Sequence, residues 1–102
     1  MSDWVIIVRV VEIVLRTRTS DGAGVVLPAI VYAKIIEEHV AVADIHVIER
    51  TIREPHERRP DARQDRERFF RREGDLWVLA VVEFGAVPAI IVTVFSAHRP
   101  PF

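Results

Sequence analysis

The sequence predicts an α+β fold: an N-terminal β-hairpin, two helices, and then a three-stranded antiparallel meander with the helices packed on one face of the sheet. Two observations support this prediction. Residues 76–96 form two apolar segments rich in β-branched residues, separated by a Gly-Ala-Val-Pro break at 85–88, as in a hairpin. Residues 45–52 instead repeat isoleucine at helical spacing. Packing the helices on one face of the sheet buries the apolar side chains of both the strands and the helices.

Composition limits the classes of function. A chain of 102 residues fits one domain, residues 1–102, and the absence of cysteine excludes disulfides, thiolate metal sites and a cysteine nucleophile. The formal charge of −1 provides no overall positive field for nucleic acid, so any phosphate binding has to be local. The apolar run at 4–15 is interrupted by Arg9 and Glu12, which disfavours a signal peptide or membrane span. We expect a cytoplasmic protein with no membrane partner.

The first half of the chain predicts a hairpin and two helices. In residues 4–15, eight of the twelve positions are Val or Ile, which favours a strand over 4–18, although the polar residues there also recur at helical spacing. A turn at 19–24 leads to a short strand at 25–27. Pro28 then suits the first turn of a helix over 29–39, and a second helix over 44–53 ends before Pro55.

The composition changes in residues 53–75, which hold eight arginines and seven acidic residues. This balance predicts solvated ion pairs, with a loop to about residue 64 and then a strand over 66–72. Residues 73–75 turn the chain into the central hairpin. The segment 98–102 contains two prolines and is expected to be an extended tail.

No compact catalytic motif is present, so the histidines are the candidates for general acid and base chemistry. They are His39 at the end of the first predicted helix, His46 early in the second, His56 in the arginine-rich segment and His98 after the last strand. Each also has a structural explanation as a helix-capping or solvated side chain. His39 and His46 are seven residues apart across a helix junction, a spacing that fixes no metal geometry, so no metal or cofactor is expected.

Several short motifs carry a family resemblance. They are LP at 27–28, KIIEEH at 34–39, IERTIREP at 48–55, RFFRR at 68–72, WVLAVV at 77–82 and IVTVF at 91–95. Together they resemble a group of phage- and mobile-element-associated nuclease-like domains related to barnase, EndoU, colicin tRNases and RelE, called the BECR fold. The likeness covers roughly residues 17–100.

The resemblance implies a metal-independent, toxin-like ribonuclease. It assigns the helix-end histidine of the group to His39, its strand arginine to Arg68 or Arg71, and its last-strand hydroxyl to Thr93. His39 or His98 would be the base or acid, the arginine would stabilise the phosphate, and Thr93 would position the substrate. Strand alternation puts Arg68 and Arg71 on opposite faces, so the sequence leaves open which of them is near Thr93.

The partners implied by this resemblance are RNA and a cognate antitoxin or immunity protein. An alternative function is a catalytically inactive, dimeric protein-interaction domain. Its basis is residues 4–14, which are apolar on both faces of the predicted strand and would therefore be covered by a second copy of the chain. We therefore also expect a homodimer.

Overall fold

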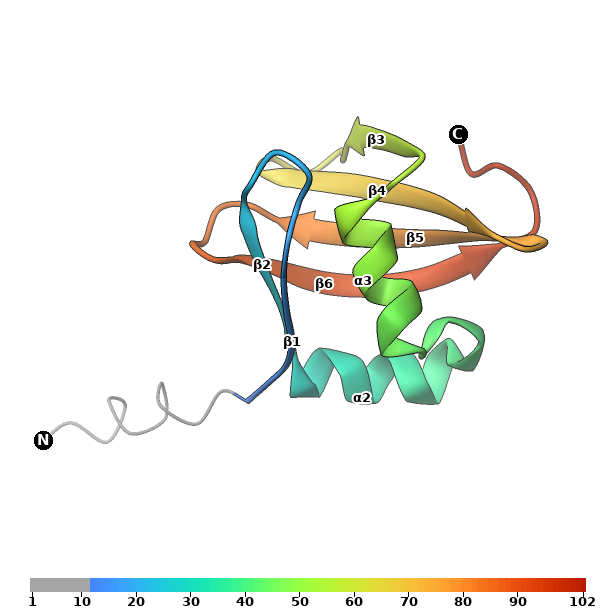
Figure 1. The fold of residues 1–102 in the computed structure, drawn as a ribbon, viewed down its shortest axis with the longest axis horizontal. Coiled ribbons are helices and arrows are strands. Elements are labelled where there is room, and N and C mark those ends of the chain that lie inside the picture. Colours follow the sequence, from blue (N-terminus) through green and yellow to red (C-terminus); the bar gives the residue numbers. More distant parts are fainter. Residues whose placement is uncertain (1–11) are drawn as a thin grey trace, which may run out of the picture.

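Six strands form one mixed sheet in the computed structural model, which describes residues 12–102 (Figure 1). The sheet order is β1-β2-β6-β5-β4-β3, and the helices of the described residues lie between β2 and β3 in the chain. The elements are β1 (Ile13–Arg18), β2 (Gly24–Pro28), α2 (Ala29–Glu38), the 3-10 helix η1 (Val40–Val42), α3 (Ile45–Arg53), β3 (Glu57–Pro60), β4 (Arg66–Glu73), β5 (Leu76–Glu83) and β6 (Ala89–Ala97). The α+β class is therefore confirmed.

Both predicted helices are present, and local chemistry fixes their ends. Pro28 precedes the first residue of α2, and the backbone N–H of His39 donates to the carbonyl of Ile35 at the other end. Asp44 caps α3 by accepting a hydrogen bond from the backbone N–H of His46 at 2.8 Å. Ile48 and Ile52 are buried, as their spacing predicts. Within residues 12–102, no helix has the length and apolar content to cross a membrane.

The predicted meander is confirmed, but the sheet is not purely antiparallel. β4 pairs with β5 and β5 with β6, all antiparallel, and β1 and β2 form the predicted hairpin. The hairpin then joins the sheet through a parallel pair, in which Val25 and Val26 of β2 lie opposite Ala89 and Ile90 of β6. The chain between β2 and β6, which contains both helices and strands β3 to β5, provides the long connection that a parallel pair requires. Residues 4–11 of the predicted first strand lie outside the described part of the chain.

The loop predicted up to residue 64 is wrong in part, because Glu57–Pro60 forms β3 and pairs antiparallel with β4. All four of its residues are charged or proline, so the segment has no apolar alternation that would indicate a strand. Such residues are common in edge strands, where they discourage pairing with other chains. The strand predicted at 66–72 is confirmed as β4.

The two helices occupy different places relative to the sheet. α3 contributes Ile48 and Ile52 to the main core, where they meet one face of β4 and β5. α2 runs alongside β6 (Figure 1), in the part of β6 that β2 leaves without a strand partner. The prediction that both helices cover one face therefore describes α3 and only partly describes α2. Because α2 protects the open edge of β6, the end of α2 is brought to the border of the sheet.

The side chains of β4, β5 and β6 alternate between the main core and a second, smaller cluster. Phe69, Val78 and Val94 belong to the main core with α3, whereas Phe70, Leu79 and Val81 are buried in the other cluster. We call the side of the sheet that carries this second cluster the outer face. Its residues on the three central strands are Arg66, Arg68, Phe70, Arg72, Trp77, Leu79, Val81, Glu83, Val92, Thr93, Phe95 and Ala97.

An ion-pair cluster joins α3 to β4. Arg50 of α3 donates from Nε and Nη2 to the carboxylate of Glu73 at 3.1 and 3.0 Å, and the Nε of Arg71 donates to Glu73 at 2.8 Å. The side chain of Glu73 is 24% exposed. Hydrogen bonds from Arg50 first and Arg71 second lower the pKa of Glu73 from 4.5 to about 2. The folded state therefore favours the ionised carboxylate.

This cluster predicts a loss of stability in acid. The pKa of Glu73 is lower in the folded state than in the unfolded state. The contribution of Glu73 to the free energy of unfolding is therefore complete above about pH 5 and is lost as the pH falls toward 2. After solvent screening we expect about 1–2 kcal/mol from this group. Urea unfolding at pH 7 and pH 3 should show a smaller acid-induced loss for Glu73→Gln than for the wild type. An equal loss in both proteins would contradict the assignment.

Candidate functional site

The cross-strand register groups the outer-face residues into rows. Arg68 of β4, Val81 of β5 and Thr93 of β6 lie directly opposite one another, and Phe70, Leu79 and Phe95 form the next row. Arg68 and Thr93 are two strands apart, so their Cα atoms are separated by about 10 Å. Arg68 is therefore the arginine that shares a face with Thr93, which answers the question that the sequence left open.

His39 reaches the same region from α2. It follows the last residue of the helix, and its half-buried ring lies 6.1 Å from the ring of Phe95, between centroids. His39 and Thr93 line one cavity of about 160 Å³ between α2 and β6. Two of the five residues predicted for the site are thus brought together. Their meeting depends on α2 lying at the border of the sheet rather than on its face.

Two charged residues that were not predicted as site residues line this cavity too. Lys34 and Glu38 come from α2 and are exposed. They are four residues apart in a helix, which places them on the same side of it. That spacing was visible in the sequence, but the position of β6 beside this side of α2 was not. The cavity therefore has one cation, one carboxylate, one imidazole and one hydroxyl among its lining groups.

Arg68 is held by an acidic neighbour and remains partly accessible. Its Nε donates to Oδ1 of Asp61 at 2.6 Å, and its side chain is 41% exposed. The pKa of Asp61 is lowered by the backbone N–H of Arg63 and then by Arg68, so the carboxylate stays ionised. A guanidinium has five N–H donors, and this contact uses only Nε. Asp61 thus orients Arg68 while leaving its terminal nitrogens available.

Arg71 and His98 lie apart from Thr93. Arg71 is on the α3 side of β4, where it contacts Glu73 and the carbonyl of Glu54. His98 is exposed in the bend after β6, five residues beyond Thr93. An extended strand covers roughly 15 Å over that distance. The structure therefore groups His39, Thr93 and, more distantly, Arg68, but it leaves Arg71 and His98 outside this group.

A second cluster on the outer face was not anticipated from the sequence. Trp77 lies directly opposite Arg72, and His56 approaches the edge of Trp77 with ring centroids 6.4 Å apart. The backbone N–H of Arg72 donates to Nδ1 of His56 at 3.0 Å. Within residues 12–102, Arg72 forms no ion pair with a carboxylate. It is therefore a cation on the outer face that no described acidic residue neutralises.

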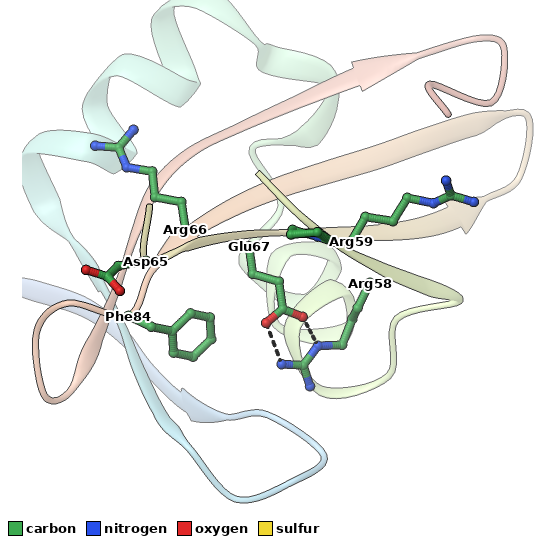
Figure 2. A pocket seen from close by; sticks show the side chains of 7 residues that line it. Arg58, Arg59, Asp65, Arg66, Glu67 and Phe84 are labelled. Atoms are coloured by element: carbon green, nitrogen blue, oxygen red, sulfur yellow. Dashed lines mark hydrogen bonds and ion pairs between the residues drawn. The ribbon is translucent and has the colours of Figure 1, made fainter. Parts of the chain in front are cut away.

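A larger pocket, of about 350 Å³, lies elsewhere and contains none of the predicted site residues. Figure 2 shows its side chains near the start of β4, with the carboxylate of Glu67 turned toward Arg58 and the guanidinium of Arg66 turned away from Phe84. Arg58 is paired with Glu67, and Arg66 with Glu83 at 2.9 Å. Because no histidine lines this pocket, we do not assign general acid and base chemistry to it.

The described residues contain no group of three or more His, Asp or Glu side chains arranged to hold a metal ion. No family model, curated protein or solved structure matches the chain.

Proposed function

We propose that the protein is a metal-independent endoribonuclease that acts at the outer face. The observation that carries this proposal is that His39 and Thr93 line one cavity while Arg68 lies in the same cross-strand row as Thr93. A candidate base, a hydroxyl and a cation that are far apart in the sequence thus border one surface. A base and a phosphate-stabilising cation are the protein groups that transesterification of RNA uses, and a hydroxyl can position the ribose. The motif resemblance to the BECR group supports the same reading.

In the proposed reaction, His39 accepts the proton of a ribose 2′-hydroxyl. The 2′-oxygen forms a bond to the adjacent phosphorus, and the bond from phosphorus to the 5′-oxygen breaks, giving a 2′,3′-cyclic phosphate. The terminal nitrogens of Arg68 stabilise the negative charge on the phosphate, and Thr93 positions the ribose by a hydrogen bond. His98 is not among the residues that line the His39 cavity, so we assign the proton taken up by the departing 5′-oxygen to water.

The size of the cavity limits how RNA can bind. Pockets that enclose ligands of drug size typically measure 300–1,000 Å³, whereas the His39 cavity measures about 160 Å³. A whole nucleotide does not fit, so RNA lies across the outer face and presents only its ribose edge to His39. This mode suits single-stranded RNA, whose 2′-hydroxyls and bases are accessible.

Arg68 and Arg71 provide a matched pair of tests, because they are three residues apart in one strand and face opposite sides of it. Arg68→Ala should reduce cleavage of a single-stranded RNA in EDTA by roughly 10²- to 10³-fold, since it removes charge stabilisation of the phosphate. Arg71→Ala should lower stability through the Glu73 cluster but retain most cleavage by the folded protein. Gel analysis at a temperature where both variants are folded gives the comparison. A larger loss for Arg71→Ala would contradict the proposed site.

The second candidate function is an inactive, homodimeric protein-interaction domain. It is favoured by apolar side chains that remain exposed on the helical side of the molecule, namely Ile30, Ile36 and Val40. An antitoxin or immunity protein is an alternative partner for this surface. A dimer alone would not decide between the two functions, because a nuclease can also dimerise. Failure of the wild type to cleave RNA would favour this second candidate.

A further inference from the structure

The chain occupies an aromatic slot on its own outer face. The ring of Phe102 meets Phe70 and Trp77 edge to face, with centroids 4.9 and 5.4 Å apart. The guanidinium carbon of Arg59 in β3 lies 4.6 Å from the centroid of the Phe102 ring. Two aromatic walls and a cation thus surround one planar ring. The segment predicted to be an extended tail is instead folded back on the sheet at its last residue.

Phe102 is held in this slot by its side chain. Phe102 as a whole residue is still 48% exposed, and residues 99–102 belong to no strand. Within the described residues, no backbone hydrogen bond from residues 99–102 to another turn or loop is present. The slot itself is built on β3, β4 and β5, whose backbones are fixed by the ladder. Phe102 can therefore leave without disrupting the sheet.

We propose that this slot, formed by Phe70, Trp77 and Arg59, binds a nucleobase of single-stranded RNA, and that Phe102 is an internal competitor for it. A base is planar and presents a π face to a guanidinium, as the Phe102 ring does to Arg59, and its ring can also contact aromatic side chains. The proposal rests on the ribonuclease function above and specifies how its substrate is held.

The surrounding charge fits this ligand. Arg72 lies opposite Trp77 in the register and has no carboxylate partner among the described residues, so it is available to a phosphate next to the bound base. Phe70 and Phe95 are in one row, two strands apart, and Phe95 contacts His39. The slot and the His39 cavity are therefore separated by about 10 Å across the same face. A short oligonucleotide can contact both.

The test uses a short 2′-O-methyl oligoadenylate, which lacks the 2′-hydroxyl proton and so cannot be cleaved by the proposed reaction. Trp4→Phe leaves Trp77 as the only tryptophan in the chain, and its fluorescence reports binding. In this background, Phe102→Ala should bind the oligonucleotide roughly 5- to 30-fold more tightly, because the competing ring is gone. Adding Arg59→Gln should remove most of that gain. Acrylamide quenching of Trp77 without ligand should also increase in Phe102→Ala.

Unchanged or weaker binding by folded Phe102→Ala would overturn the proposal, since Phe102 would then be neutral or part of the binding surface. Equal affinity for adenosine monophosphate and for the oligonucleotide would overturn RNA as the ligand. The 2′-O-methyl oligonucleotide reports binding independently of cleavage. Retained tight binding with no cleavage of ordinary RNA would thus reject the ribonuclease and leave the slot, while the opposite result would reject only the slot.

Discussion

Replacing His39 by alanine is expected to reduce RNA cleavage by about 10²- to 10⁴-fold, the usual contribution of a general base. The expected loss follows from its position: the imidazole lines a cavity with Thr93 and contacts Phe95 at the border of the outer face. Initial rates on a fluorescent single-stranded RNA in EDTA provide the measurement.

His46→Ala is the matched control for this result. His46 is exposed in the first turn of α3, and its backbone, not its ring, makes the contact to Asp44. This variant should therefore cleave RNA at nearly the wild-type rate. Equal rates for His39→Ala and the wild type, with both proteins folded, would remove His39 from the mechanism.

Phe69→Ala is expected to lower the free energy of unfolding by about 3–5 kcal/mol, because it leaves a cavity in the main core. Phe69 is fully buried, its ring lies 6.3 Å from that of Phe84 between centroids, and the guanidinium of Arg58 lies 4.4 Å from its centroid. For a domain of this size, each kcal/mol shifts the melting temperature by roughly 4–8 °C. Chemical unfolding followed by circular dichroism measures the change.

Phe102→Ala makes the same truncation at a half-exposed position and should cost much less. Comparing the two losses in the free energy of unfolding distinguishes a ring of the buried core from the ring that fills the outer-face slot. A loss at position 102 as large as that at position 69 would mean that Phe102 is a structural element of the sheet and cannot leave the slot.

The sequence predicted those elements whose pattern is local. β-Branched density over 76–96 predicted the β5–β6 hairpin, and isoleucine spacing predicted α3. The arrangement of the sheet depends on contacts between distant residues, which no local pattern contains. Neither the parallel pairing of β2 with β6 nor the position of α2 beside β6 could be inferred in this way.

For the candidate site too, the sequence identified individual residues but not their arrangement. His39 and Thr93 were selected from the sequence, and they line one cavity because β6 is open on the side that α2 covers. Alternation alone placed Arg68 and Arg71 on opposite faces, but only the register shows that Arg68 is opposite Val81 and hence in line with Thr93. The slot was missed because Arg59 lies in β3, which was predicted to be a loop, and because its occupant Phe102 depends on the path of the chain from β6 back to Trp77.

A DNA oligonucleotide that contains a single ribonucleotide, incubated with the wild type in EDTA, tests the proposed ribonuclease mechanism most directly. We predict one cut, immediately 3′ of the ribose, leaving a 2′,3′-cyclic phosphate and a 5′-hydroxyl that mass spectrometry can identify. The all-deoxy oligonucleotide should remain intact, because it lacks the attacking hydroxyl. Absence of cleavage by folded protein, or cleavage of the all-deoxy strand, would contradict the proposed ribonuclease mechanism.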